Sequence, residues 1–510
     1  MRRPGDRPAL SIGNDVNVAD YLLRNAANDA TAVVDATGRH TYGDLKDLVA
    51  AHSAALADLR LRPSARVAVV APNGFGWVGA YLAILASGMV AVPVPNTLTP
   101  EEIAARLRWI GADATILGAR EVKQLNGRVP HALPLVPERA SRLDNGAAVS
   151  YHEVGGDADA VYAFTSGTTG VPRAVRHTHE NLQANTASIL EYLPVTAGDR
   201  VLVVLPFSYV FGASVLHTHL RVGATLVIQP NAVFPQSMVE RMSTERCTGF
   251  AGVPSTFHVL LRNSTFGSQA LPDLRMVQQA GGKLAPALVR ELIAAQPQAK
   301  VFVMYGQTEA TARLSFLPPE DLERKLGSIG RGIPGVTLRV VAPEGGPVAA
   351  GQVGEIWARG RNISPGYLND PEETERRMPD GELHTGDLAT VDADGYIYVV
   401  DRKEDFIKSW GFRIASQDVE STAIQLTELV AVTVVGVPDE AAGERVELVA
   451  VKRPNASITA EDVLRYCRAH LAKQMVPARV RFVARLPLNV NGKVSKAAVR
   501  ELCLRLEEES

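Results

Sequence analysis

Residues 160–182 read AVYAFTSGTTGVPRAVRHTHENL: an apolar run, then a loop rich in hydroxyl residues and glycine, then a charged stretch. The apolar run predicts a buried strand. Glycines let backbone N–H groups approach an anion, and the hydroxyl groups can donate further hydrogen bonds, so such a loop can fold around a polyphosphate. It is not a Walker loop, because the Gly-Lys-Ser/Thr ending is missing. A lone loop of this composition could also be a surface turn, so its context matters.

Runs of β-branched residues alternate with helix-like runs on both sides of this stretch. RVAVV from Arg66, RVLVVL from Arg200 and KVFVMY from Lys300 predict strands, and APALVRELIAA from Ala285 predicts a helix. This alternation predicts an α/β protein with largely parallel sheets. From about Gly335 the sequence changes to short β-like pieces separated by glycine and proline turns, which predicts a smaller β-rich lobe.

A charged run, DRKED at 401–405, interrupts this pattern and precedes a compact stretch of helix-like and strand-like segments. We therefore expect a domain boundary at this point. The expected architecture is α/β, with a large N-terminal domain (residues 1–402) made of two α/β lobes and a small β-rich lobe. A small, mobile α+β domain (residues 403–510) is expected to follow it.

The composition is that of an ordinary globular protein. Of the 510 residues, 46% are apolar and 21% charged, and 53 Lys and Arg against 55 Asp and Glu give a net charge of −2. This balance gives no reason to expect a nucleic acid or a membrane surface as the principal partner. Three scattered cysteines (Cys247, Cys467 and Cys503) do not make a disulfide framework, and the first residues lack the apolar core of a secretory signal. We expect a cytoplasmic protein.

Residues 67–100 contain no charged side chain, and such a stretch is long enough to span a bilayer. It also contains Pro72, Pro93 and Pro95, and a helix-like block from Trp77 to Ala86 lies between two β-branched runs. We interpret it as a buried strand–helix–strand unit and expect no membrane span.

Six segments, in order and with matching spacing, resemble those of the adenylate-forming superfamily, which contains acyl-CoA synthetases, peptide-synthetase adenylation domains and firefly luciferases. The likeness runs from about residue 160 to the C-terminus, and the preceding part fits the opening lobe of that family. The segments are TSGTTGVPRAVRHTHENL from Thr165, AGG from Ala280, YGQTEA from Tyr305, GELHTGDLA from Gly381, DRKEDFIKSWGFRI from Asp401 and LPLNVNGKVSK from Leu486.

The resemblance implies an ATP-dependent carboxylic acid ligase. In that reaction a carboxylate attacks the α-phosphate of ATP to give acyl-AMP and pyrophosphate, and the acyl group then passes to an acceptor. Two anions must meet, so catalysis depends mainly on positioning and on electrostatic stabilisation. ATP and Mg²⁺ are the expected cofactors, with coenzyme A as a co-substrate if the acceptor is a thiol.

The same resemblance implies roles for individual residues. Thr308 and Glu309 are expected to hold the α-phosphate and Mg²⁺, and Tyr305 to stack on adenine. Asp387 is expected to accept hydrogen bonds from the ribose hydroxyls, with the Arg402 guanidinium beside it. The nucleotide site as a whole is expected to comprise Thr165, Ser166, Gly167, Thr168, Thr169, Gly170, Gly281, Gly282, Tyr305, Gly306, Gln307, Asp387 and Arg402, and the catalytic set Lys493, Thr308, Glu309 and His179.

Lys493, near the C-terminus, is implied to bridge the substrate carboxylate and the α-phosphate. Because it lies far in sequence from the phosphate loop, the two domains must close for adenylation. The likeness also implies that the small domain then turns about a hinge at Glu404 and presents its face near Gly411 to an acceptor. Trp410 replaces a small residue here. It either narrows the path of a pantetheine arm or packs on the core of its own domain.

The acid pocket is expected to be lined by Phe207, Tyr209 and Phe211 with Gly281 and Gly306, which predicts an alkyl, alicyclic or aryl acid. A free amino acid is disfavoured, because the segment LPFSYVFG offers no Asp to its ammonium group. A thiol acceptor, on coenzyme A or a separate carrier protein, is slightly favoured over an amine, as used by amide ligases of the coronafacate ligase type. Luciferase-like oxygenation is a more remote alternative. The sequence predicts neither the individual acid nor the oligomeric state.

Overall fold

The computed structural model describes residues 17–125, 127–135, 148–165, 173–229, 234–403, 405–489 and 493–508. Its first lobe is built on a six-stranded sheet, in which neighbouring strands are parallel except for the pair β7 and β8. Thr165 directly follows the carboxyl end of β7. In sheet order the strands are β6 (Ala132–Pro134), β5 (Ala114–Leu117), β3 (Arg66–Val70), β4 (Val90–Pro93), β7 (Asp159–Phe164) and β8 (Ala174–Thr178).

The second lobe is built on a nine-stranded sheet that is parallel from β13 to β1 and antiparallel at both edges. In sheet order the strands are β15 (Arg331–Gly332), β14 (Ser315–Leu317), β13 (Lys300–Tyr305), β12 (Met276–Gln279), β11 (Gly249–Gly252), β9 (Arg200–Val203), β10 (Thr225–Ile228), β1 (Thr31–Asp35) and β2 (Gly38–Thr41). The parallel β-branched runs of both lobes therefore form the sheets that the alternation predicts.

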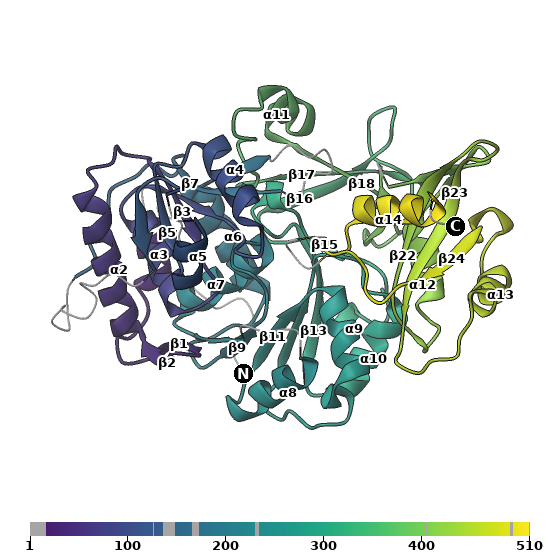
Figure 1. Cartoon of the computed structure of the whole chain (residues 1–510), viewed down its shortest axis with the longest axis horizontal. Helices are drawn as coiled ribbons and strands as arrows, with labels where there is room; N and C mark the ends of the chain where they lie inside the picture. Colours follow the sequence, from purple (N-terminus) through teal and green to yellow (C-terminus); the bar gives the residue numbers. More distant parts are fainter. Residues whose placement is uncertain are drawn as a thin grey trace.

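The helices surround these sheets, and one apolar cluster joins α1, α3, α6 and α7 to strands of both lobes (Figure 1). The two lobes therefore share a core. The helices are α1 (Val18–Leu23), α2 (Tyr42–Asp58), α3 (Phe75–Ala86), α4 (Pro100–Ile110), α5 (Ala119–Leu125), α6 (His179–Tyr192), α7 (Val210–Val222), α8 (Pro235–Thr244), α9 (Pro254–Asn263), α10 (Pro286–Ala295), α11 (Pro371–Arg377), α12 (Ser416–Ala423), α13 (Ala460–His470) and α14 (Lys496–Glu508).

Helix α3 carries no charge because it is buried on all sides, with every residue from Trp77 to Ala86 inside. With β3 and β4 it forms the strand–helix–strand unit that the sequence predicts. No helix among the described residues is long and apolar enough to cross a membrane. The Trp77 ring lies 5.1 Å from both the Tyr81 ring and the Phe207 ring, measured between centroids, and so fixes the segment that leads into α7.

Two smaller sheets complete the structure, and together the four sheets confirm the expected fold class of a large α/β domain with a small α+β domain. A four-stranded antiparallel sheet forms the β-rich lobe, and a five-stranded sheet carries α12, α13 and α14. In sheet order the strands are β16 (Val336–Val341), β17 (Gly354–Gly360), β18 (Leu383–Val391) and β19 (Ile397–Arg402), then β21 (Phe412–Ile414), β20 (Ile407–Ser409), β23 (Gly443–Lys452) and β22 (Leu429–Asp439), with β24 (Arg479–Phe482) paired to β23.

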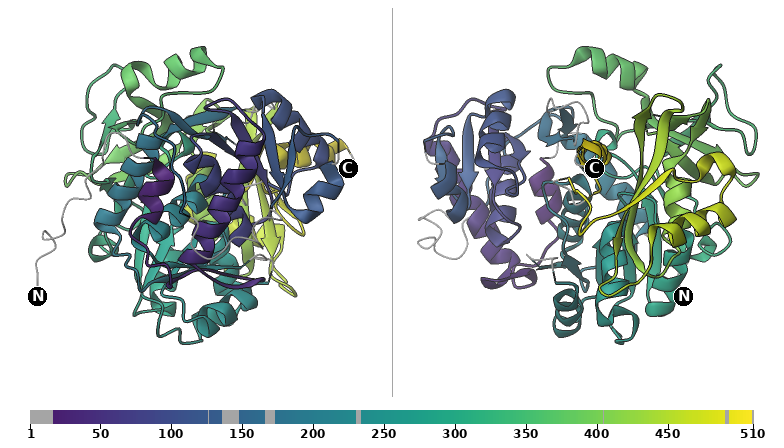
Figure 2. Two further views of the ribbon diagram at one scale, coloured as in Figure 1. Left: turned by 90° about the vertical axis from the view of Figure 1, so that its left-hand side faces the viewer. Right: turned by 45° about the vertical axis from the view of Figure 1, so that its right-hand side comes forward.

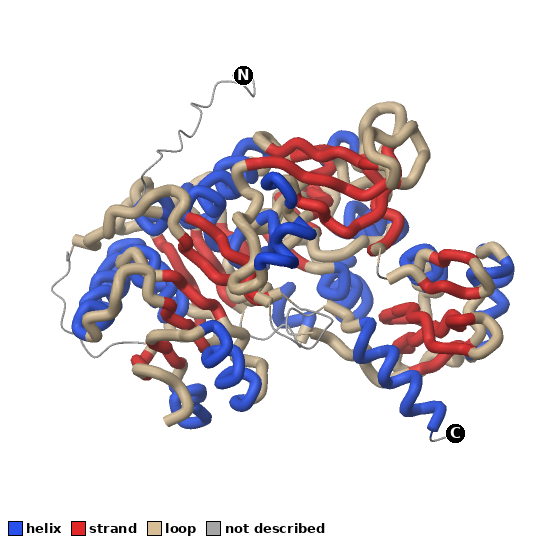
Figure 3. Tube along the Cα trace, turned by 90° about the horizontal axis from the view of Figure 1, so that it is seen from above, coloured by secondary structure: helices blue, strands red, loops and turns tan. Residues whose placement is uncertain are grey.

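The C-terminal domain rests against the second lobe, with β22 beside α9 (Figures 1 and 2). The Nε2 atom of His258 on α9 lies 3.4 Å from the Leu429 carbonyl oxygen on β22. At the end of β19, the buried Asp401 carboxylate accepts hydrogen bonds from the Ser416 N–H at 2.7 Å and the Ser416 hydroxyl at 2.8 Å. Figure 3 shows this domain as a separate group of strands and helices. Its boundary at residue 402 and its mobility stay predictions.

Trp77→Ala should lower the free energy of unfolding by about 3–5 kcal/mol, because it removes a large, fully buried side chain and leaves a cavity. Trp410→Ala is the matched control: Trp410 is 66% exposed, so the same change there should cost no more than about 0.5 kcal/mol. Thermal unfolding of both variants measures the difference. Equal losses of stability would contradict the shared core.

Candidate active site

The carboxyl ends of β12 and β13 open into a cavity of about 120 Å³, closed on one side by the segment that starts α7 and on another by the C-terminal domain. Ligands of α/β proteins commonly bind at this end of a parallel sheet. Of the residues predicted for the site, the structure brings together Thr165, Tyr209, Phe211, Gly281, Gly306, Gln307, Thr308, Glu309, Arg402 and Lys493. The lining also contains Val210, Ala280, Ala312, Arg313 and Arg377.

Two of the expected glycines are required by close contacts. Gly281 has φ of +88°, and a Cβ there would lie 3.0 Å from the Tyr209 hydroxyl oxygen and 3.4 Å from Lys493 Cε. A Cβ on Gly306 would lie 1.9 Å from the Ala312 carbonyl oxygen. A side chain at 306 would displace backbone, and at 281 the positive φ and the Tyr209 hydroxyl both disfavour one, so the cavity walls here are flat.

Tyr305, Asp387 and Arg402 form one polar group at the edge of this cavity. The Tyr305 hydroxyl donates to Asp387 Oδ2 at 2.5 Å, and Arg402 Nε lies 3.2 Å from Asp387 Oδ1. Asp387 and Arg402 face each other because they are paired residues of β18 and β19. The buried Asp387 carboxylate raises the pKa of Arg402, and burial raises the pKa of Tyr305. A carboxylate fixed in this way can accept hydrogen bonds from a diol.

Thr308 and Glu309 lie on a short 3₁₀ turn, η3 (Thr308–Ala310), directly after β13. The Tyr367 hydroxyl donates to Glu309 Oε1 at 2.7 Å and so holds the carboxylate. The described residues contain no group of three or more His, Cys, Asp or Glu side chains suited to a metal. Glu309 is therefore a single carboxylate, which fits Mg²⁺ bound mainly through phosphate oxygens and water.

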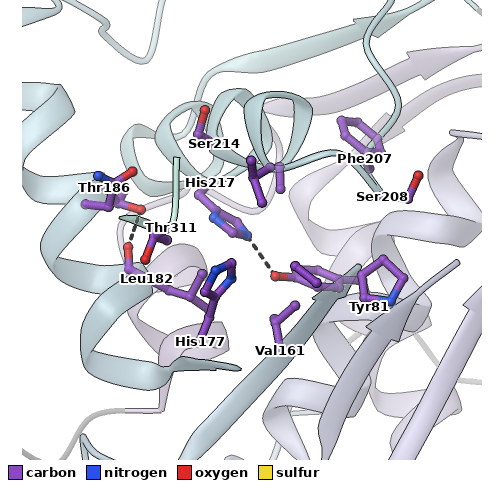
Figure 4. Close-up of a pocket in the computed structure, with 15 residues that line it drawn as sticks. Tyr81, Val161, His177, Leu182, Thr186, Phe207, Ser208, Ser214, His217 and Thr311 are labelled. Atoms are coloured by element: carbon purple, nitrogen blue, oxygen red, sulfur yellow. Dashed lines mark hydrogen bonds between the residues drawn. The ribbon is translucent and has the colours of Figure 1, made fainter. Parts of the chain in front are cut away.

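A second, smaller pocket of about 20 Å³ lies behind this turn (Figure 4). His177 Nε2–H donates to the Thr308 carbonyl oxygen at 2.7 Å, and the Tyr81 hydroxyl lies 2.9 Å from His217 Nε2. Burial lowers the pKa of His177 to about 4 and that of His217 to about 3. Both rings are therefore neutral at pH 7, and His177 supports the Thr308 backbone. Phe207, predicted for the acid site, lines this pocket instead.

Lys493 reaches the cavity from the C-terminal domain. Its Nζ lies 5.2 Å from the centroid of the Tyr209 ring. Its backbone is held by Asn489, whose N–H donates to the Lys493 carbonyl oxygen at 2.7 Å and whose Oδ1 accepts from the Lys493 N–H at 3.1 Å. The domains are thus closed with the ammonium group inside the site.

The structure does not bring His179 into the cavity. Its side chain is 1% exposed, and Nδ1 accepts a hydrogen bond from the Val18 N–H at 3.1 Å, which ties α1 to α6. His179 therefore belongs to the packing of the first helix, and this geometry gives the catalytic prediction no support. Gly282, which faces Pro254, is likewise absent from the cavity lining among the described residues, and so are Tyr305 and Asp387, which lie behind Arg402. Ser166, Gly167, Thr168, Thr169, Gly170 and Glu404 lie outside the described residues.

Trp410 and Gly411 form the turn between β20 and β21, with φ of +51° and +78°. The Trp410 side chain is 66% exposed and that of Phe412 is 52% exposed. Trp410 is therefore not packed on the core of its own domain. Its place in an acceptor channel stays a prediction.

Sequence reasoning missed three residues near the site: His177, Arg313 and Arg377. The Arg377 guanidinium donates to the Thr385 carbonyl oxygen at 3.0 Å and to Gln307 Oε1 at 3.2 Å, and so joins α11 to the cavity. A signal existed for Arg313, which is the one charge in the run ATARLSFL after Glu309. The sequence contains no such signal for His177, because its contact with Thr308 joins residues that are 131 positions apart in the chain.

Comparison with known proteins identifies the same kind of enzyme family as the six sequence motifs do. The family described as AMP-binding enzyme matches residues 23–368, and its C-terminal domain matches residues 418–493. The chain belongs to the AMP-binding enzyme family. The Rhodococcus jostii (strain RHA1) 3-[(3aS,4S,7aS)-7a-methyl-1,5-dioxo-octahydro-1H-inden-4-yl]propanoyl:CoA ligase is 32% identical, over 94% of this chain and 97% of its own.

Solved structures of AMP-binding enzymes superpose over nearly the whole chain. ATP-bound MatB from Rhodopseudomonas palustris is 26% identical with a TM-score of 0.86, covering 95% of this chain and 98% of its own. The amide bond synthetase McbA from Marinactinospora thermotolerans is 27% identical with a TM-score of 0.86, covering 95% and 99%. The chain is therefore similar both to a protein named as a CoA ligase and to one named as an amide bond synthetase.

The stability of the protein should fall as the pH is lowered from 7 towards 4. Buried His177 and His217 stay neutral in the folded state, while the unfolded chain takes up protons from about pH 6.5 downwards. Each such histidine costs up to about 1.4 kcal/mol per pH unit in this window. His217→Gln should therefore flatten the fall of the unfolding temperature with pH, and His470→Gln, at an exposed histidine, is the control. Equal slopes in wild type and His217→Gln would contradict this.

Proposed function

We propose that the protein is an ATP-dependent acid–thiol ligase, which activates a carboxylic acid as acyl-AMP with release of pyrophosphate and transfers the acyl group to coenzyme A. The observation that carries this proposal is the position of Lys493. An ammonium group on one domain enters a cavity that the other domain lines with Thr308, Glu309 and a flat glycine wall. Such an arrangement suits a reaction in which two anions approach each other.

The nucleotide half of the proposed site lies around Tyr305. Its ring and the flat wall at Gly281 take the adenine, and the Asp387 carboxylate, held by Tyr305 and Arg402, accepts hydrogen bonds from the ribose hydroxyls. Thr308 and Glu309 take the α-phosphate, with His177 holding the backbone of Thr308 from behind. Mg²⁺ bound at Glu309 would neutralise charge on the phosphate oxygens.

Lys493 acts at the point where the new bond forms. A carboxylate that approaches a triphosphate meets strong repulsion, and negative charge grows on the phosphorus oxygens in the transition state. An ammonium group fixed between the two reactants reduces the repulsion and stabilises the growing negative charge. Most of its effect appears in the transition state. Because Lys493 comes from the C-terminal domain, the closed arrangement serves adenylation, and the acceptor step needs the domain to turn.

The second candidate is an amide synthetase, in which an amine attacks the acyl-AMP directly. Two observations favour it: the similarity to McbA and the bulk of Trp410 beside Gly411. The similarity to a CoA ligase over nearly the whole chain favours the thiol.

Mass spectrometry of one reaction decides between the acceptors. Protein, Mg-ATP, a panel of carboxylic acids, coenzyme A and the common amino acids are incubated together. The proposal predicts an acyl-CoA product. An N-acyl amino acid without acyl-CoA would overturn the thiol assignment in favour of the amide synthetase.

Lys493→Ala should lower the rate of acyl-AMP formation by about a hundredfold or more, as loss of a transition-state charge contact does. Transfer from preformed acyl-AMP to the acceptor should be spared, because Lys493 acts only in the first step. Lys473→Ala, at an exposed lysine of the same domain, is the control and should match wild type in both steps. An equal fall in both half-reactions of Lys493→Ala would mean that Lys493 supports the fold or both steps alike.

A further inference from the structure

Arg313 is a buried cation in the wall of the active-site cavity. Its side chain is 2% exposed, and its Cζ lies 4.0 Å from the centroid of the Phe211 ring. Its Nε donates to the Met304 sulfur at 3.4 Å, a weak acceptor. Arg313 thus lies against the acid side of the cavity, on a ring that the acid is expected to touch.

No carboxylate among the described residues forms an ion pair with Arg313. Burial lowers the pKa of its guanidinium, and the Tyr192 and Tyr209 hydroxyls offset only part of this effect. The other two arginines of the cavity differ, since Arg402 pairs with a carboxylate and Arg377 donates to a backbone carbonyl and an amide. Burying an arginine without a carboxylate partner is costly, and the face of an aromatic ring compensates only part of that cost.

Arg313 and Lys493 lie against two neighbouring rings of one aromatic wall. Lys493 Nζ is beside the Tyr209 ring, Arg313 Cζ is beside the Phe211 ring, and the two ring centroids are 6.4 Å apart. The reacting carboxylate belongs at the Lys493 end, next to Thr308. A molecule that extends from there along the two rings brings its far end to the guanidinium.

We propose that the acid substrate carries a second oxygen acceptor, such as another carboxylate, which the Arg313 guanidinium binds at the Phe211 end of the Tyr209–Phe211 wall. The proposal rests on the proposed function and adds the substrate class to it. The spacer between the two groups is compact, of the size of one aromatic ring or a short alkyl chain, because the centroids of the Tyr209 and Phe211 rings are only 6.4 Å apart. An α-ammonium group is excluded from this end by like charge.

The test measures acid-dependent release of pyrophosphate from ATP with matched pairs of acids. Each pair has one skeleton, with a hydrogen in one member and a second carboxylate in the other: pentanoate with adipate, and benzoate or phenylacetate with their dicarboxylate counterparts. The full-length wild type should prefer the dicarboxylate member of at least one pair by about 10- to 100-fold in kcat/KM, the gain typical of a hydrogen-bonded charged partner. Arg313→Met should abolish or reverse that preference.

Arg221→Met is the matched control. Arg221 is also buried and also stacks on a ring, with Cζ 4.1 Å from the Tyr21 centroid, but it does not line the cavity. Arg221→Met should lower the unfolding temperature, but the variant should show the same preference between paired acids as the wild type. The measured quantity is the ratio of kcat/KM for two acids on the same protein. A general loss of folded enzyme lowers both values equally and leaves this ratio unchanged.

The outcomes separate the two proposals. Pyrophosphate release with no preference for the second acceptor, or an equal preference in wild type and Arg313→Met, would overturn the role of Arg313 and leave the ligase intact. Failure of every acid to release pyrophosphate would overturn the proposed function, and this inference with it.

Discussion

The Lys493 side chain leaves the C-terminal domain and ends beside the Tyr209 ring of the large domain, and the rest of the proposed site depends on this contact. It requires the C-terminal domain to lie against the second lobe, where α9 lies beside β22, and against β19 of the β-rich lobe, where Asp401 binds Ser416. Glycine at position 281 belongs to the same contact, because its φ of +88° disfavours a side chain and a Cβ there would lie 3.0 Å from the Tyr209 hydroxyl oxygen. The flat wall and the closed domains are therefore two parts of one steric and electrostatic constraint.

The distribution of charge explains why this cavity suits acid activation. In the proposed function its cations stand at separate places: Lys493 where the carboxylate and the phosphate would meet, and Arg402 paired with Asp387, the expected ribose ligand. Arg313 lies beside Phe211, and Arg377 is bound to Gln307 and Thr385. A charge fixed before the substrate arrives costs no reorganisation during the reaction. The buried and neutral His177 and His217 add no further charge, and His177 holds the turn that carries Thr308 from behind.

Much of the fold could be predicted from the sequence, because hydrophobic patterns reflect burial directly. The charge-free stretch at 67–100 is β3, α3 and β4, and the run KVFVMY is β13. The nucleotide-site residues came from local motifs, and those that are described, except Gly282, lie in or beside one cavity. Arg313 was not predicted, since an arginine in a sequence is ordinarily taken as exposed. His177 and the orientation of Trp410 depend on tertiary contacts, which local sequence does not encode. His179 follows the phosphate loop in sequence, yet its ring packs against α1.

The measurement that tests the central claim most directly is the exchange of labelled pyrophosphate into ATP in the absence of any thiol or amine. If Lys493 completes a site for acyl-AMP formation, the label should enter ATP whenever a suitable carboxylic acid is present, and without an acceptor. Label that enters ATP without acid, or only after coenzyme A or an amine is added, would contradict the account.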